Sequence, residues 1–238
     1  MHIAINFFSG ILIFLGLGFS TSGYFLFKTK PGKISNILPL LFASGILLNY
    51  TIVLIVQTLK TAILISTILS LPGNAVFIYY IFKFRSHFFN FKRINFMPLF
   101  LFLSIYIVYV LTILANPLTD WDARSIWYFH GKIIFSYGAF SKEAGFTETA
   151  VKWAQIDYPK LNAVLSAQFA YYTGYWNEYM PKISLAYLLL PVLLWIFTFF
   201  KFNLSFILLL VIFPFSILIN TIVRWCLKTF LKSPRGEV

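Results

Sequence analysis

The sequence predicts an all-α polytopic membrane protein, with about seven transmembrane helices and an amphipathic interfacial helix in a long extracytoplasmic loop. Of its 238 residues, 60% are hydrophobic and only 11% are charged, a composition unlike that of soluble domains. Seven stretches contain no Asp, Glu, Lys or Arg, and each is near the ~20 residues that a spanning helix needs. They are residues 3–27, 34–59, 61–82, 94–119, 161–177, 183–200 and 202–223.

The order of these stretches divides the chain into four parts. Residues 1–115 hold four N-terminal transmembrane helices, and 116–160 form an extracytoplasmic acidic loop with the interfacial helix. Residues 161–223 hold three further transmembrane helices, and 224–238 form a basic cytoplasmic tail. No basic segment precedes the first stretch, which is too long for a signal peptide, so we expect a retained helix.

The stretch 161–177 is the shortest and has two readings. It contains Asn162, Gln168 and three tyrosines, which are unusual in a lipid-facing span. A crossing helix is favoured, and a re-entrant or interfacial helix is the alternative.

The placement of the basic residues predicts the orientation. If all seven stretches cross, residues 28–33, 83–93, 178–182 and the tail from 224 share one side and carry twelve of the nineteen cations. The positive-inside rule makes that side cytoplasmic, so the N-terminus lies outside and the C-terminus inside. We assign these cations to membrane-flanking and lipid headgroup contacts, with no nucleic-acid partner.

Familiar catalytic and metal-binding motifs are missing from the sequence. The single cysteine, Cys226, cannot form an intramolecular disulfide and belongs to no metal-ligand spacing. No P-loop, dinucleotide-binding glycine pattern, HExxH or Gly-x-Ser-x-Gly is present. The sequence therefore requires no cofactor and predicts no metal site, while a divalent cation stays open.

The main functional signal is the loop at 116–160. Loops this long usually have a function, and this one gathers charge at one membrane face. Five of the seven acids of the chain lie in it, together with three tryptophans: Asp120, Asp122, Glu143, Glu148, Asp157, Trp121, Trp127 and Trp153.

Within the loop we expect a helix from an N-cap at Thr119 to about Phe135. Asp122 would head an apolar row on one face of it, which would partly desolvate the carboxylate, raise its pKa and suit it to accept a proton. The alternative is that Asp122 only caps the helix. The row, spaced i, i+4, i+7 and i+11, is Asp122, Ile126, Phe129 and Ile133.

Three segments carry a resemblance to a known family. Residues 120–127 (DWDARSIW), continuing to Lys132, resemble the first periplasmic loop of bacterial polytopic glycosyltransferases of the C superfamily (GT-C). That group includes relatives of protein O-mannosyltransferases and lipid A aminoarabinose transferases. Residues 157–161 (DYPKL) and 174–181 (GYWNEYMP) are similar to two later motifs of the same family, in the same order.

The resemblance implies transfer of a sugar from a polyprenyl-phosphate donor to an extracytoplasmic acceptor, by an integral protein of the bacterial inner membrane. Asp122 takes the position of the general base, with Asp120 as the second choice. Lys160 takes the donor-phosphate position, where an ammonium suits a phosphate leaving group. Arg124 either assists that phosphate or pairs with Asp120, four residues away.

Three further residues are assigned supporting roles. Asp157 orients Lys160 or contributes to a divalent-ion site. Tyr158 belongs to the same motif. His130 is the weakest candidate, because a lone histidine on an interfacial helix is more often a tolerated polar residue than a base.

The chain departs from the family pattern in length and in the position of its acidic loop, which follows the fourth apolar stretch rather than the first. We therefore expect a short or truncated member, with a partner polypeptide as one source of missing helices. The alternative function is that of a non-catalytic membrane protein, either an assembly subunit or an inactive remnant of such an enzyme. Uncharged spans argue against a transporter.

Overall fold

The computed structural model describes residues 2–26, 34–83, 96–115, 123–140, 154, 159–177 and 179–199. Nearly all of these residues are helical, as the sequence predicts; the one β-type contact among them is an isolated antiparallel bridge between Thr58 and Ala139. The chain forms two compact units, Met1–Thr198 and Phe199–Val238. The packing of the helices described below belongs to the first unit.

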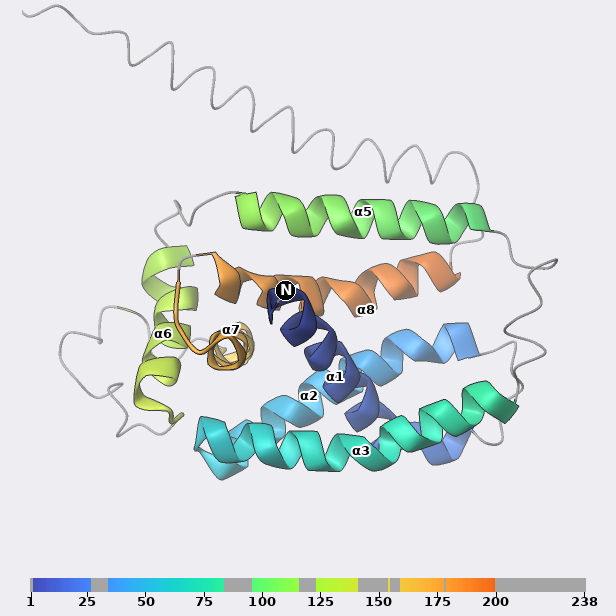
Figure 1. Ribbon diagram of the computed structural model, residues 1–238, viewed down its shortest axis with the longest axis horizontal. Coiled ribbons are helices and arrows are strands. Elements are labelled where there is room, and N and C mark those ends of the chain that lie inside the picture. The colour runs from blue at the N-terminus through green and yellow to red at the C-terminus, as the bar shows by residue number, and fades with distance from the viewer. Residues whose placement is uncertain are drawn as a thin grey trace, which may run out of the picture. The chain divides into compact units, whose positions relative to one another are not determined.

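Seven α-helices and two short turns of other helix types make up the described part of the chain (Figure 1). A π-helical turn, η3 (Ala123–Trp127), precedes α6, and a 3₁₀ turn, η6 (Met180–Ile183), precedes α8. The helices are α1 (His2–Leu26), α2 (Ile34–Val56), α3 (Leu59–Lys83), α5 (Phe96–Ala115), α6 (Tyr128–Tyr137), α7 (Leu161–Thr173) and α8 (Ser184–Phe199).

Three helices, α1, α2 and α3, are long and apolar enough to cross a membrane, and α5 and α8 carry shorter apolar segments. Large side chains on these helices face outward, as lipid contact requires; Ile55 is 76% exposed and Phe82 is 68% exposed. By contrast, α7 has 13 residues, about 20 Å at 1.5 Å per residue, which is less than the ~30 Å hydrocarbon core. The helix lengths thus do not confirm seven spans, and the stretch 202–223 lies outside the described residues.

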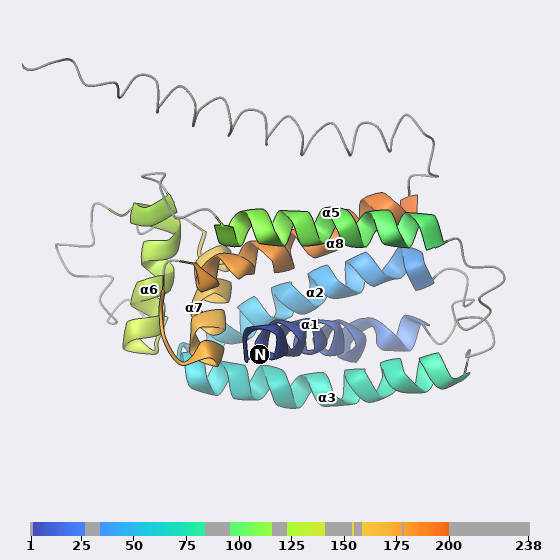
Figure 2. The same cartoon turned by 45° about the horizontal axis from the view of Figure 1, so that its top comes forward.

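Helix α1 packs closely against α2 and α3 (Figure 2). Glycines make this approach feasible, because a methyl group at Gly45 would overlap the backbone oxygen of Phe14, and one at Gly73 would overlap that of Gly16. Small residues at such contacts are typical of helices that associate in lipid.

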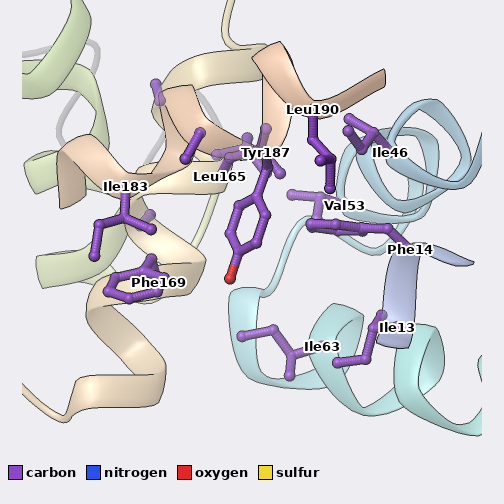
Figure 3. Packing of buried hydrophobic residues seen from close by; sticks show 14 of the residues in the cluster. Ile13, Phe14, Ile46, Val53, Ile63, Leu165, Phe169, Ile183, Tyr187 and Leu190 are labelled. Carbon is purple, nitrogen blue, oxygen red and sulfur yellow. The ribbon is translucent and has the colours of Figure 1, made fainter. Parts of the chain in front are cut away.

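The apolar core joins these helices to α7 and α8 (Figure 3). Tyr187 of α8 lies among Phe14, Val53 and Leu190, with Phe169 of α7 on its other side. Its hydroxyl donates a hydrogen bond to the backbone oxygen of Phe7, 3.0 Å away. The start of α1 is thereby attached to the start of α8.

A reciprocal pair of amide side chains connects α2 with α7. Asn49 Nδ2 donates to Gln168 Oε1 at 2.9 Å, and Gln168 Nε2 donates to Asn49 Oδ1 at 3.1 Å. Both residues are buried. In an apolar interior each amide satisfies the other, so the pair fixes how α7 lies against α2.

The turn η6 is attached to the C-terminal end of α5 by a buried lysine. Lys182 Nζ donates to the backbone oxygen of Ile113 at 2.7 Å, and its side chain is only 4% exposed. Carbonyls in the last turn of a helix lack partners within the helix and attract cations. The turn η6 therefore lies beside the end of α5 that leads into residues 116–160. A crossing helix at 161–177 would place η6 and this end of α5 on opposite sides of the membrane.

Removing one amide of the Asn49–Gln168 pair should destabilise the protein more than removing both. Asn49→Leu or Gln168→Leu leaves a buried amide unsatisfied, at a cost of about 1–3 kcal/mol, whereas the double variant should recover most of that loss. Thermal unfolding in detergent measures the four proteins, with Thr51→Leu on the exposed side of α2 as the control. Additive losses in the double variant would contradict the pairing.

Candidate functional site

Buried polar side chains gather where α6 meets α7 and the first residue of α8. Helices α6 and α7 lie side by side in both views (Figures 1 and 2). Buried or half-buried polar groups are uncommon in so apolar a chain and mark functional positions. We call this group the α6–α7 polar cluster; its members are Tyr128, His130, Lys160, Asn162, Ser166 and Ser184.

Backbone contacts fix the end of α6. The helix ends at Gly138, whose left-handed conformation (φ 64°) suits glycine. Gly138 accepts a hydrogen bond from the Leu59 amide at 2.8 Å, and the Phe140 amide donates to Gln57 at 2.6 Å. The residues that join α2 to α3 thus hold α6 in place.

A glycine also brings α6 close to α7. A methyl group at Gly131 would lie 2.9 Å from the Trp176 side chain and 3.1 Å from the backbone oxygen of Ala163. This contact sets Tyr128 and His130, which precede Gly131 on α6, against the start of α7. The first hydrogen bond of α7 is donated by the Val164 amide to the Lys160 carbonyl, at 2.8 Å.

His130 is neutral at physiological pH. Its side chain is 1% exposed. Burial and, to a smaller extent, the positive charge of Lys160 lower its pKa to about 4, and a hydrogen bond with the Ala154 backbone partly opposes these two effects. A neutral imidazole beside a buried ammonium can accept a hydrogen bond, and it does not add a second positive charge.

Lys160 occupies a position that favours an anion. It is the N-cap residue of α7 and is 8% exposed. The start of a helix carries partial positive charge, so a buried ammonium there combines with the helix to attract negative groups. A phosphate or carboxylate at this point would be stabilised by both.

A network of hydroxyls connects α7 with α8 beside these residues. Ser184 Oγ donates to Asn162 Oδ1 at 2.8 Å, and Ser166 Oγ lies 2.9 Å from Ser184 Oγ and 2.8 Å from the Asn162 backbone oxygen. The pKa of Tyr128 is raised to about 12, mainly by burial, and side-chain hydrogen bonds with Asn162 and Ser184 partly oppose that rise. An open hollow of about 310 Å³ adjoins the network, lined by Trp127, Tyr128, Asn162 and Leu185.

The structure brings two of the sequence-predicted site residues together, since the charge of Lys160 acts on His130. Arg124 is exposed on η3. The remaining candidates lie outside the described residues: Asp120, Asp122, Asp157 and Tyr158.

Of the helix expected from an N-cap at Thr119 to about Phe135, residues 123–137 are helical in η3 and α6, and Thr119 lies outside the described residues. Ile126 and Ile133 of the predicted apolar row are both buried. The turn η3, which precedes α6, is π-helical, a wider form of helix often found at functional sites.

Sequence reasoning missed four members of the cluster. Asn162 and Ser166 stand four residues apart in an uncharged stretch, a spacing that places both on one helix face and was available as a signal. Tyr128 and Ser184 carried no local signal, because their roles depend on contacts between α6, α7 and α8. Among the described residues there is no group of three His, Cys, Asp or Glu side chains that could hold a metal ion.

Comparisons with protein-family models, with curated proteins and with solved structures gave no significant match.

Acid should destabilise the fold through His130. Its folded pKa, about 4, lies below the ordinary 6.5, so the unfolded chain takes up the proton first as the pH falls. The free energy of unfolding therefore has its full value above about pH 6.5 and falls by about 3 kcal/mol as the pH drops to about 4. Unfolding in detergent between pH 7 and 4 should show a shallower pH dependence for His130→Asn than for wild type or for the matched variant His87→Asn. Equal slopes in all three proteins would refute this.

Proposed function

We propose that this chain is a membrane glycosyltransferase that moves a sugar from a polyprenyl-phosphate donor to an extracytoplasmic acceptor. The observation that carries the proposal is the buried ammonium of Lys160 at the start of α7, next to neutral His130. Together with the acidic motif at 120–127, this provides an anion-binding group and a carboxylate base in one region of the chain.

In the proposed reaction, the acceptor hydroxyl attacks the anomeric carbon of the sugar while the bond from that carbon to the phosphate oxygen breaks. Asp122 takes the hydroxyl proton, with Asp120 as the alternative base. The polyprenyl phosphate leaves with the electron pair of the broken bond. Lys160 stabilises the charge that develops on the phosphate, and a desolvated ammonium does this better than an exposed one.

The remaining residues have supporting roles in this proposal. His130 accepts hydrogen bonds without competing for the anion, because it stays neutral at physiological pH. Arg124 is exposed, which suits either a transient phosphate contact or a pair with Asp120. Asp157 and Tyr158, next to Lys160 in sequence, orient the lysine. A divalent cation and a partner polypeptide stay open.

The membrane arrangement is part of the proposal. α1, α2, α3, α5 and α8 cross the membrane, whereas α6 and α7 lie at the outer interface. The cations at 28–33 and 83–93 then lie in the cytoplasm and the N-terminus lies outside. A cytoplasmic tail from 224 would require that 202–223 does not cross.

Exposed tyrosines favour the interfacial position of α6 and α7. Tyr137 follows the polar cluster on α6, Tyr171 and Tyr175 lie at the end of α7, and Tyr179 precedes η6. Tyrosines concentrate at the level of lipid headgroups, where a ring contacts acyl chains and a hydroxyl contacts water. This position would bring a lipid-linked donor directly to Lys160.

Transfer of labelled sugar from polyprenyl-phosphate donors in membranes tests the function. Lys160→Ala and Asp122→Asn should each lower the rate about 100-fold or more, as loss of a charge-stabilising group or a base does. Lys132→Ala, which removes an exposed lysine from α6, should leave the rate unchanged. Wild-type rates in both site variants would remove the assignment, and no transfer from any donor would favour a non-catalytic membrane protein.

A further inference from the structure

We infer that a network of uncharged side chains holds the ammonium of Lys160 in place for the donor phosphate. The inference deepens the proposed function and rests on it for the identity of the anion. It assigns a role to members of the α6–α7 polar cluster that the proposed transfer step does not use, and in this role they act through Lys160 rather than on the reacting atoms. We call them the positioning network; its members are Tyr128, Asn162, Ser166 and Ser184.

Lys160 stands at a position that a lysine does not stabilise. It is the N-cap residue of α7. At an N-cap, the side chain of Ser, Thr, Asp or Asn normally accepts a hydrogen bond from the first turn, whereas a lysine side chain has no acceptor. The ammonium is also 8% exposed and belongs to the positive end of the helix dipole. Other groups must therefore hold the start of α7.

The positioning network holds the start of α7 from two neighbouring helices. Ser184, the first residue of α8, donates from Oγ to Asn162 Oδ1 at 2.8 Å, and Ser166 Oγ lies 2.8 Å from the Asn162 backbone oxygen. From α6, Tyr128 forms side-chain hydrogen bonds with Asn162 and Ser184. Asn162 is the second residue of α7, two positions after Lys160. These contacts therefore restrain the backbone that carries the lysine.

All four members of the network are uncharged, which suits a positioning role. An Asp or Glu in the same place could restrain the turn as well, but it would also attract the Lys160 ammonium. Hydroxyl and amide groups restrain the turn through hydrogen bonds and add no competing negative charge. Ser166 and Ser184 are both 0% exposed, so water does not compete for their bonds. The network therefore fixes the lysine without taking part in neutralising it.

A restrained ammonium binds an anion more tightly than a mobile one. A lysine has a long, flexible side chain whose freedom is lost on binding. Burial and a fixed start of α7 remove part of that cost before the ligand arrives. The charge of Lys160 acts on His130 of α6, so the ammonium is held close to that imidazole. His130 therefore reports the position of Lys160 when no ligand is bound.

The first test follows the pKa of His130 by NMR of labelled histidine, in the full chain in lipid nanodiscs without ligand. Tyr128→Phe and Ser184→Ala should each raise this pKa toward 6.5, because the Lys160 charge moves away from the ring. The same variants in a Lys160→Ala background should cause no further rise, since the charge through which they act is gone. Tyr171→Phe, at an exposed tyrosine near the other end of α7, should leave the pKa unchanged.

The comparison of the two backgrounds separates positioning from an ordinary effect on packing. A hydroxyl with a purely structural role would change the hydration of His130 equally with and without Lys160. Equal rises of the His130 pKa in both backgrounds would therefore overturn the inference. An unchanged pKa in Tyr128→Phe and Ser184→Ala would overturn it as well.

The second test measures binding of a polyprenyl phosphate and of the corresponding polyprenol, which lacks the phosphate. Tyr128→Phe and Ser184→Ala should each bind the phosphate about 5- to 10-fold more weakly than wild type, with polyprenol binding unchanged. Neither variant should weaken phosphate binding further in the Lys160→Ala background, and Tyr171→Phe should bind both lipids like wild type. Equal weakening of both lipids, or wild-type binding of the phosphate by both variants, would overturn the inference.

The two tests distinguish failure of the positioning network from failure of the proposed function. The proposed function fails if Lys160→Ala binds the polyprenyl phosphate as tightly as wild type does. The measurement on His130 needs no ligand, so it still decides whether the network positions the lysine.

Discussion

A buried polar group without a partner is costly in so apolar a chain, and this cost decides where the polar helices are attached. Water is scarce in such an interior, so an unsatisfied amide or ammonium costs several kcal/mol. Gln168 of α7 is paired with Asn49 of α2, and Lys182 of η6 is bonded to the carbonyl of Ile113 in α5. These contacts restrict the positions of α7 and η6 more than apolar packing does, because apolar packing tolerates many arrangements.

The same contacts determine the chemistry of the candidate site. Because α7 is held against α2 and against α6, its first turn sets Lys160 close enough for its charge to lower the pKa of His130. The hydroxyls of Ser166 and Ser184 then join α7 to α8 and orient Asn162. A cation, a neutral base and oriented polar groups are thereby gathered on short elements, outside the long apolar helices that lipid surrounds. Such a division keeps charge out of the long apolar helices.

The sequence predicted the features that depend on composition and on the spacing of apolar residues. It was less informative about the features that depend on contacts between helices. The apolar stretches and the helix that ends near Phe135 follow from residue type and spacing, whereas the role expected of Lys160 came from the family resemblance. The burial of His130 was not predicted, because it comes from packing of α6 on α7 that no local pattern encodes. The short length of α7 was signalled by Asn162 and Gln168, but a stretch without charges resembles a span until the amide partner on α2 is known.

The central claim is that α6, α7 and η6 lie at one membrane face. Accessibility of single cysteines to a membrane-impermeant thiol reagent, in a Cys226→Ser background, tests it most directly. Ser136→Cys on α6 and Tyr179→Cys before η6 are at exposed positions and should be labelled from the same side, opposite to Lys30→Cys. Labelling of positions 136 and 179 from opposite sides would show that α7 crosses the membrane and would contradict the account.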